Sequence, residues 1–341
     1  MSRILKVSYI ALSVILILML IILFTLRYGG PKISSAPVTS ASGSGNSITN
    51  GNPANLSANA KAADPEENAY PFNSDDFTSN EPATPKKDIS LIFQMDISDI
   101  HRGNLILINT KNIYDIPEDH GFVDIAEFKT SSYRLADGVF LLSNSVIEPL
   151  NDMMDAFYAE TGNNSITVIS AFRDYQRQQE ILDEYIAIVG RKEASKWAAT
   201  PGYSEHHAGL AVDLGIYSDG VTRTFLRTSV TEWFFQNSAQ FGFIPRYSDS
   251  KTSITKTAFE PWHFRYVGVP HASFIRQMDF CFEEYIDFIS GFTCDEPYTA
   301  VYNNAEYEIY FTKDLEIHIP YGCEFDISGN NIDGFIVTIK R

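Results

Sequence analysis

One aspartate in the middle of an apolar strand constrains this chain more than any other residue. The segment GLAVDLGI, residues 209–216, alternates in such a way that Asp213 shares one face with Gly209 and Ala211, while larger apolar side chains occupy the other face. A carboxylate in such a strand is costly unless it is paired or bound to a metal ion. The fold must therefore bring a partner to Asp213, and the small Gly209 and Ala211 leave room for one.

Histidines are the expected partners. His206 lies seven residues before Asp213, just ahead of the strand, close enough for both side chains to bind one ion. The adjacent His207 is expected to point elsewhere, toward solvent or a supporting contact. A third ligand is available in AFEPWHFRYVG, residues 258–268, which contains His263. The remaining histidines lie in polar or turn contexts without a second ligand nearby and are expected to be structural or solvated: His101, His120, His271 and His318.

Two histidines and one carboxylate with an open fourth position describe a catalytic zinc site better than a closed structural one. Glu260, three residues before His263, is a nearby carboxylate that can take a proton from an attacking water. Arg173 lies in a short turn between a predicted strand and a predicted helix, where a cation can face the negative charge that builds on an attacked carbonyl oxygen. Each spacing alone is common, but the conjunction favours a metal site over histidines that fill polar pockets.

The periodicity of apolar residues predicts an α+β fold. Strands are expected at GNLILINT and SITVISAF, residues 103–110 and 165–172, and helices around 147–157 and over 175–190, the second capped by Asp174. After Gly291, short alternating runs are broken by turn residues such as Asn-Asn and Tyr-Gly, which predicts a small all-β appendage. Strands and helices mix without a strict βαβ repeat, as in α+β proteins.

The first part of the chain has a different character. Residues 7–26 contain no charge and as a helix would measure about 30 Å, enough to span a bilayer. The run is longer than that of a cleaved signal peptide and lacks a small-residue cleavage site, so we expect a signal anchor with the chain that follows outside the cell. Residues 29–88 are rich in Ser, Asn, Gly, Ala and Pro, as in flexible tethers.

These patterns predict four regions: a transmembrane helix over 1–28, a disordered tether over 29–88, a catalytic domain over 89–288 and a β-rich appendage over 289–341. The expected location is the cell membrane, single-pass, with the catalytic domain on the cell-wall side. The formal net charge of −17, with no stripe of Lys and Arg, argues against a nucleic-acid partner. No pattern indicates the oligomeric state.

Three cysteines, Cys281, Cys294 and Cys323, lie near the C-terminal end. Outside the cell they permit one disulfide with one thiol left over, and the three pairings are equally open. Their spacing is not that of a zinc site.

Three stretches together resemble the VanY-type D-alanyl-D-alanine carboxypeptidases, which belong to a wider group of zinc D,D-peptidases with a hedgehog-like fold. The stretches are SAFRDYQRQQ, TPGYSEHHAGLAVDL and GFIPRYSDSKTSITKTAFEPWHFRYVG. They follow the family patterns S-x-x-R-x(4)-Q, S-x-H-x(2)-G-x-A-x-D and E-x-W-H. The resemblance covers about residues 90–285, so the tether and the β appendage lie outside it.

The resemblance implies that the cofactor is Zn²⁺ and that its ligands are His206, Asp213 and His263. One departure is His207, because many relatives carry glutamine after the ligand histidine. The spacing to Asp213 nevertheless favours His206 as the ligand.

By the same resemblance, Glu260 is the base, Arg173 stabilises the transition state, and Gln178 and Ser204 bind the substrate. The implied reaction removes the C-terminal D-alanine from peptidoglycan stem peptides. An L,D-carboxypeptidase or an endopeptidase would use the same ligands, and the motifs do not separate these activities. A non-catalytic wall-binding protein would be expected to lack the base or the arginine, and this chain has both.

Overall fold

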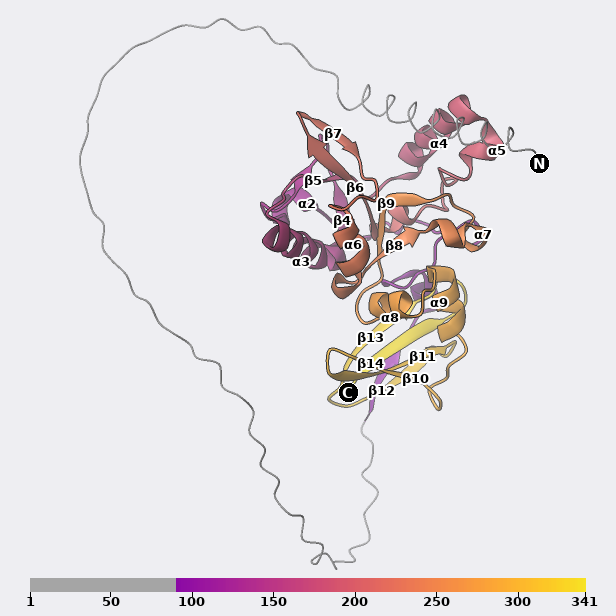
Figure 1. Ribbon diagram of the computed structural model, residues 1–341. Helices are drawn as coiled ribbons and strands as arrows, with labels where there is room; N and C mark the ends of the chain where they lie inside the picture. Colours follow the sequence, from indigo (N-terminus) through magenta and orange to yellow (C-terminus); the bar gives the residue numbers. More distant parts are fainter. Residues whose placement is uncertain (1–89) are drawn as a thin grey trace, which may run out of the picture. The chain divides into compact units, whose positions relative to one another are not determined.

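The computed structural model describes residues 90–341, so the predicted transmembrane helix and tether lie outside the described residues. No helix within 90–341 combines the length and the apolar character that a membrane span requires. The described chain has the predicted α+β fold, in which helices pack around a central sheet and a second sheet is built from the C-terminal strands (Figure 1).

The central sheet carries the strand on which the prediction rests. Its strands run in the order β3-β5-β6-β9-β8, and β7 pairs with the end of β6. Their bounds are Arg134–Leu135 for β3, Ile166–Ser170 for β5, Ala211–Ser218 for β6, Val221–Thr224 for β7, Phe243–Tyr247 for β8 and Glu260–Tyr266 for β9. In this register Asp213 of β6 stands directly opposite His263 of β9, and Ser170 of β5 stands on its other side. Two of the three predicted ligands, Asp213 and His263, therefore lie in the middle of the sheet.

Two helices predicted from periodicity are confirmed. Helix α3, Asn144–Thr161, buries its apolar stripe against β5 and β6, where Leu150 and Phe157 join Val212 in one core cluster. Helix α4, Tyr175–Val189, begins after Asp174, whose carboxylate accepts a hydrogen bond of 2.7 Å from the backbone N–H of Arg177. The first five residues of β6 are all buried, so both faces of the strand pack against protein at this end. The alternation of small and large side chains therefore distinguishes two buried faces and not a core face from a solvent face.

Shorter elements complete this part of the chain. Strands β2 (Phe122–Asp124) and β4 (Leu141–Ser143) form a separate antiparallel pair. The short helical elements are η1 Ile97–His101, α2 Ile125–Phe128, α5 Arg191–Ala194, η2 Glu205–Ala208, α6 Glu232–Asn237, η3 Ser238–Phe241, η4 Asp249–Lys251, α7 Thr252–Thr255, α8 His271–Gln277 and α9 Phe282–Ile289.

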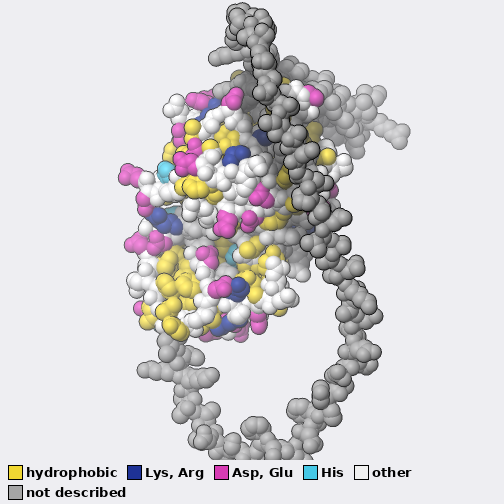
Figure 2. Space-filling view, turned by 90° about the vertical axis from the view of Figure 1, so that its left-hand side faces the viewer, with side chains coloured by type: hydrophobic (Ala, Val, Ile, Leu, Met, Phe, Trp, Pro, Cys, Tyr) yellow, Lys and Arg dark blue, Asp and Glu magenta, His cyan; other side chains and the backbone are white. Residues whose placement is uncertain are grey.

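The C-terminal residues form the expected strands. An antiparallel sheet has the order β10-β11-β14-β13, with bounds Tyr298–Tyr302, Ala305–Thr312, Phe335–Lys340 and Glu324–Gly329. Strand β12, Glu316–Pro320, instead pairs with β1, Ser90–Gln94, from the other end of the described chain. Hydrophobic side chains gather at the lower part of the face in Figure 2, where the C-terminal strands lie.

Helices α8 and α9 lie between the central sheet and the C-terminal sheet (Figure 1). Their buried side chains share one core cluster with Leu105, with Ile244 of β8, and with Ile309 and Ile336 of the C-terminal sheet. Core packing is thus continuous across residue 288, and the domain boundary placed there stays a prediction.

The prediction of a strand over residues 103–110 is wrong, although the segment is buried. It forms an irregular loop in which Leu105 is fully buried. The backbone N–H of Leu105 donates to Ser328 Oγ at 2.9 Å, and that of Leu107 donates to the carbonyl oxygen of Asn330 at 3.1 Å. Because these contacts satisfy backbone groups that burial would otherwise leave unpaired, the segment needs no neighbouring strand.

All three cysteines are free thiols in the structure. Cys281 is buried at the start of α9, Cys294 is exposed, and Cys323 is partly buried.

Candidate metal centre

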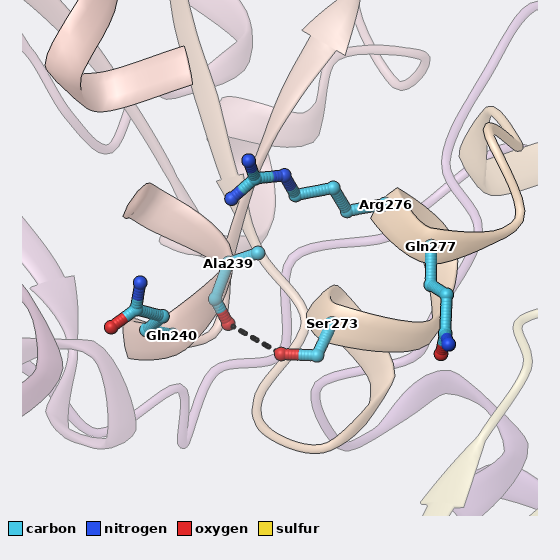
Figure 3. Close-up of a pocket in the computed structure, with 5 residues that line it drawn as sticks. All are labelled: Ala239, Gln240, Ser273, Arg276 and Gln277. Carbon is cyan, nitrogen blue, oxygen red and sulfur yellow. Dashed lines mark hydrogen bonds between the residues drawn. The ribbon is translucent and has the colours of Figure 1, made fainter. Parts of the chain in front are cut away.

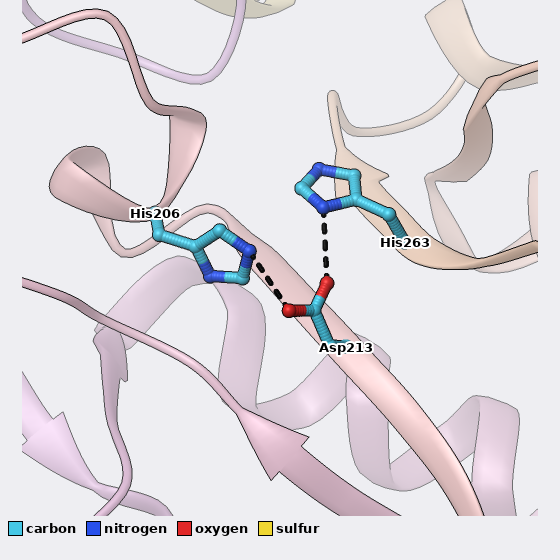
Figure 4. Close-up of side chains that lie close together, drawn as sticks. All are labelled: His206, Asp213 and His263. Atoms are coloured by element: carbon cyan, nitrogen blue, oxygen red, sulfur yellow. Dashed lines mark hydrogen bonds and ion pairs between the residues drawn. The ribbon is translucent and has the colours of Figure 1, made fainter. Parts of the chain in front are cut away.

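Three predicted ligands converge on one point. His206 comes from η2, just before β6, while Asp213 and His263 come from β6 and β9 (Figure 4). All three side chains are buried, and one donor atom of each lies within 4.8 Å of the others. The register of β6 and β9 explains the convergence of the two strand residues, because directly opposite side chains in antiparallel strands lie next to each other.

The spacing of the donor atoms fits a metal ion. His206 Nε2 is 3.3 Å from Asp213 Oδ2, and His263 Nδ1 is 3.0 Å from Asp213 Oδ1. A tetrahedral ion with bonds of 2.0–2.1 Å places neighbouring ligand atoms about 3.3 Å apart. Two imidazole nitrogens and one carboxylate are the donors of many catalytic zinc sites, so the residues present suit this ion.

The surroundings of His206 prepare it as a ligand. Its Nδ1–H donates to the carbonyl oxygen of Ala171 at 2.5 Å, which leaves the lone pair of Nε2 facing Asp213. Burial, followed by the charge of Arg173, lowers the pKa of His206 to about 4. The ring is therefore neutral at physiological pH, as metal binding requires.

His263 is held from both sides. Its Nδ1 faces Asp213, and its Nε2 lies 3.1 Å from Glu205 Oε2. Burial alone would lower the pKa of His263, but the hydrogen bonds to Asp213 and Glu205 outweigh it and raise the pKa to about 9 in the metal-free protein. Both ring nitrogens then donate to carboxylates, and a metal ion would take the place of the proton on Nδ1.

Glu260 stands beside the ligands without joining their cluster. Its Oε2 is 3.9 Å from His263 Nδ1, and the side chain is buried. Burial raises the pKa of Glu260 to about 8, with Asp213 adding a repulsive charge and His263 opposing the shift. A carboxylate next to a metal site with a raised pKa has the character of a residue that exchanges protons.

Arg173 contacts two of the metal ligands, and no other arginine within residues 90–341 has a hydrogen bond or ion pair to them. Its Nη2 donates to His206 Nε2 at 2.8 Å and forms an ion pair with Asp213. Its Nε donates to Ser170 Oγ at 2.8 Å. The arginine follows β5 and precedes α4, so two regular elements hold the turn that carries it.

The two predicted substrate-binding residues are buried, and Gln178 contacts Arg173. Gln178 of α4 accepts a hydrogen bond of 3.2 Å from Arg173 Nη1 and donates to the carbonyl oxygen of Ala199 at 2.8 Å. Ser204 precedes η2 as its N-terminal cap residue. In the structure Gln178 thus orients the arginine, and its predicted contact with substrate stays a prediction.

The structure decides between two expectations for His207 and corrects one for Gly209. His207 points to a supporting contact and not to solvent: it is fully buried, donates from Nδ1 to the carbonyl oxygen of Arg173 at 2.6 Å and accepts at Nε2 from the N–H of Gly202 at 3.0 Å. Gly209 does not make room for a metal ligand. A Cβ on Gly209 would lie 2.8 Å from the ring of Phe122 and 2.9 Å from the backbone nitrogen of Ser143.

A buried group of charges beside the ligands was missed by the sequence analysis. Glu205, next to His206, accepts hydrogen bonds from Arg246 of β8 and Arg265 of β9 as well as facing His263. Arg265 offers a usable signal, because it stands between Phe264 and Tyr266 in an apolar strand. A buried guanidinium, like the buried carboxylate of Asp213, is costly without a partner, so Arg265 predicts a buried carboxylate beside it.

A separate hollow of about 310 Å³ lies between η3 and α8 (Figure 3). Its lining residues are Ala239, Gln240, Ser273, Arg276 and Gln277. None of the predicted site residues lines it, so the candidate chemistry does not belong to this hollow.

Known proteins share this arrangement of sequence and fold. The VanY family model, described as D-alanyl-D-alanine carboxypeptidase, matches residues 140–269, which include all seven predicted site residues. A D-alanyl-D-alanine carboxypeptidase of Enterococcus faecium is 32% identical over 248 residues, which cover 70% of this chain and 76% of that protein. Another from Enterococcus faecalis is 38% identical over 199 residues, covering 55% and 68%.

The fold has a solved counterpart. The vancomycin-resistance D,D-dipeptidase VanXYg, determined in complex with a D-Ala-D-Ala phosphinate analogue, superimposes with a TM-score of 0.66 and 32% identity, covering 74% of this chain and 100% of that chain. Sequence and fold agree, and the chain belongs to the VanY family of D-alanyl-D-alanine carboxypeptidases.

Proposed function

We propose that this chain is a zinc-dependent D-alanyl-D-alanine carboxypeptidase that removes the C-terminal D-alanine from peptidoglycan stem peptides. The observation that carries the proposal is the convergence of His206, Asp213 and His263 beside Glu260, in a member of the VanY family. The raised pKa of Glu260 supports a role in proton exchange.

His206, Asp213 and His263 would hold the zinc ion. When bound, zinc acts as a Lewis acid that acidifies water and polarises the scissile carbonyl. Asp213 and His263 stand directly opposite each other on paired strands, which holds these two ligands side by side.

The residues around the ligands supply the remaining steps. The carboxylate of Glu260 takes a proton from the attacking water, whose oxygen bonds to the carbonyl carbon of the substrate. As the C–N bond breaks, the same proton passes to the amine of the departing D-alanine. Arg173 stabilises the negative charge on the carbonyl oxygen of the tetrahedral intermediate, and Gln178 keeps the guanidinium oriented through its 3.2 Å hydrogen bond.

We further propose that residues 7–26 anchor the enzyme in the cell membrane, with the catalytic part on the cell-wall side. Supporting this are the twenty uncharged residues of the segment and the low-complexity composition of residues 29–88. A tether of such length would allow a root-mean-square reach on the order of 40 Å, so the site could meet stem peptides near the membrane. Protease accessibility of the C-terminal residues in intact cells tests this orientation.

Replacement of Glu260 tests the chemical role. We expect Glu260→Ala to retain zinc and to lose release of D-alanine from a defined pentapeptide stem by at least about 100-fold, because proton transfer typically contributes this much. The measurements are metal content of the purified protein and D-alanine release with and without a chelator.

A surface variant, Glu127→Ala on α2, serves as the control and should keep wild-type turnover. Hydrolysis by Glu260→Ala at the wild-type rate would refute the assignment. Tetrapeptide stems and free D-Ala-D-Ala, assayed in parallel, separate D,D-carboxypeptidase activity from L,D-carboxypeptidase and dipeptidase activities.

A further inference from the structure

Four charged side chains, three of them buried and one partly buried, lie on the side of His263 away from Asp213. They are Glu205, Arg246, Arg265 and Glu283, and the side chains of the first three are fully buried. Two acids and two arginines balance one another in charge. Buried charges of this kind are expensive to desolvate, so they persist only where each is paired.

The contacts form a continuous chain from α9 to a ligand. Arg246 donates two parallel hydrogen bonds to the carboxylate of Glu283, at 2.7 and 2.8 Å. The same guanidinium donates from Nε to Glu205 Oε1 at 2.8 Å. The other oxygen of Glu205 lies 3.1 Å from His263 Nε2. A planar guanidinium can bridge two carboxylates in fixed geometry, which a lysine cannot do.

Arg265 locks Glu205 from a second direction. Its Nη1 donates to Glu205 Oε1 at 3.1 Å, and its Nη2 donates to the carbonyl oxygens of Asn104 and Ile106 in the buried loop. Glu205 is thus held by two arginines on its Oε1, so its Oε2 is directed at His263. A carboxylate that accepts from the distal nitrogen of a ligating imidazole fixes the ring and its tautomer for metal binding.

We propose that Glu205 is a positioning residue for the His263 ligand, and that Glu283 of α9 supports it through Arg246. The inference rests on the metal site of the proposed function. It extends the support of that site beyond residues 140–269, which match the family model, into helix α9.

The physical consequence concerns both geometry and charge. Arg246 contacts two carboxylates, those of Glu205 and Glu283. When Glu283 is replaced by glutamine, Arg246 interacts more strongly with Glu205, and the carboxylate of Glu205 becomes a weaker hydrogen-bond acceptor for His263. The buried group also gains one net positive charge, which opposes a divalent cation nearby. Both effects weaken metal binding, although neither Glu205 nor Glu283 touches the metal position.

The test measures zinc affinity by competition with a chelating dye, using the full chain. We expect Glu205→Gln to lower the affinity by about 10- to 100-fold, and Glu283→Gln by about tenfold. Arg246→Lys keeps the positive charge but loses the bridging geometry, and it should also lower the affinity. The absorption bands of the cobalt-substituted protein should shift in Glu205→Gln, because the orientation of one ligand changes.

Tyr285→Phe is the matched control. Tyr285 is buried on the same helix, two residues from Glu283, and its hydroxyl hydrogen-bonds His271 Nδ1 at 2.7 Å, away from the ligands. This variant should unfold more easily than the wild type and bind zinc with unchanged affinity. A merely structural role for Glu283 predicts the same result for Glu283→Gln.

The outcomes separate the hypotheses. If Glu283→Gln and Arg246→Lys bind zinc as tightly as Tyr285→Phe does, the proposed support from α9 is refuted. If Glu205→Gln does not fold, the zinc affinities of Glu283→Gln and Arg246→Lys still test the proposal. If the wild-type protein itself binds no zinc, the proposed function fails together with this inference, whereas wild-type affinity in every variant refutes only this inference.

Discussion

Glu260 and His263 both hold their protons more tightly in the folded, metal-free protein than in an unfolded chain. The pKa of Glu260 rises from 4.5 to about 8 and that of His263 from 6.5 to about 9. A raised pKa stabilises the folded state fully below the unfolded value and ceases to do so above the folded value. The contribution of Glu260 is therefore lost between pH 4.5 and 8, and that of His263 between pH 6.5 and 9.

Between pH 6.5 and 8 both contributions fall together, so the metal-free protein should become less stable as the pH rises through that range. Below pH 6.5 the lowered pKa values of the buried His206 and His271 act in the opposite direction. We expect Glu260→Gln to remove the part of the pH dependence that Glu260 contributes between pH 4.5 and 8, because a neutral amide has no proton to lose. Urea unfolding in the presence of a chelator, at several pH values, measures the effect. The exposed substitution Glu127→Gln should leave the decline as it is, and an equal pH dependence in both variants would contradict the prediction.

At the scale of elements, the loop that carries His206 is pressed directly against β4. Gly209 ends η2 in the left-handed conformation, with φ of 63°, and its carbonyl oxygen accepts a hydrogen bond of 2.9 Å from the N–H of Ser143. A side chain at this position would meet both the ring of Phe122 and the backbone of Ser143. The glycine therefore fixes the distance between the loop and its neighbouring strand.

Gly209→Ala should cost about 2–5 kcal/mol of stability, the sum of about 1–2 kcal/mol for the left-handed conformation and about 1–3 kcal/mol for overpacking. Gly162 provides a matched comparison, because it ends α3 with φ of 67° and has open space where a Cβ would be. Gly162→Ala should cost only about 1–2 kcal/mol. Chemical denaturation of both variants gives the two values, and equal losses would show that the close approach to β4 contributes nothing.

The same scale shows what could be read from the sequence. A carboxylate in an apolar strand demands a partner, which identifies Asp213, and the segment 258–268 offers His263. The register of β6 and β9 places the two residues directly opposite each other. The prediction of a strand over 103–110 fails because the pattern of apolar residues indicates only that the segment is buried. The pattern does not report which groups satisfy the backbone, and here Ser328 and Asn330 do so from more than 200 residues away.

Arg265 in its strand predicts that a buried carboxylate pairs with it, but the sequence does not identify that carboxylate as Glu205, since Arg246 and Arg265 come from two later strands. Motif spacing identifies residues that share a short stretch. Only the tertiary fold reveals that α9, outside the motifs, reaches the same buried group through Glu283.

At the scale of the whole described chain, the C-terminal sheet and the part before it share one core. Ile309 and Ile336 are fully buried in the cluster that also contains side chains of α8 and α9. Burial of each such side chain is worth about 1.5–3 kcal/mol, so these two alone contribute about 3–6 kcal/mol. This is a large fraction of the 5–15 kcal/mol by which a typical domain is stable.

A chain that ends at residue 288 tests the predicted boundary. We expect residues 90–288 to unfold at a much lower temperature than residues 90–341, or not to fold, because removal of the strands exposes the shared core and leaves β1 without β12. Circular dichroism melting of the two chains is the measurement. Equal melting temperatures would support an independently folding catalytic domain and contradict the argument from the core.

Both ring nitrogens of the buried His207 make hydrogen bonds to the backbone. The imidazole donates one hydrogen bond to the carbonyl oxygen of Arg173 and accepts one from the N–H of Gly202. A primary amide also offers one donor and one acceptor on a planar group. A glutamine could make the same two hydrogen bonds. His207 therefore ties the turn at Arg173 to the loop at Gly202 through hydrogen bonds and does not serve as a second metal ligand beside His206.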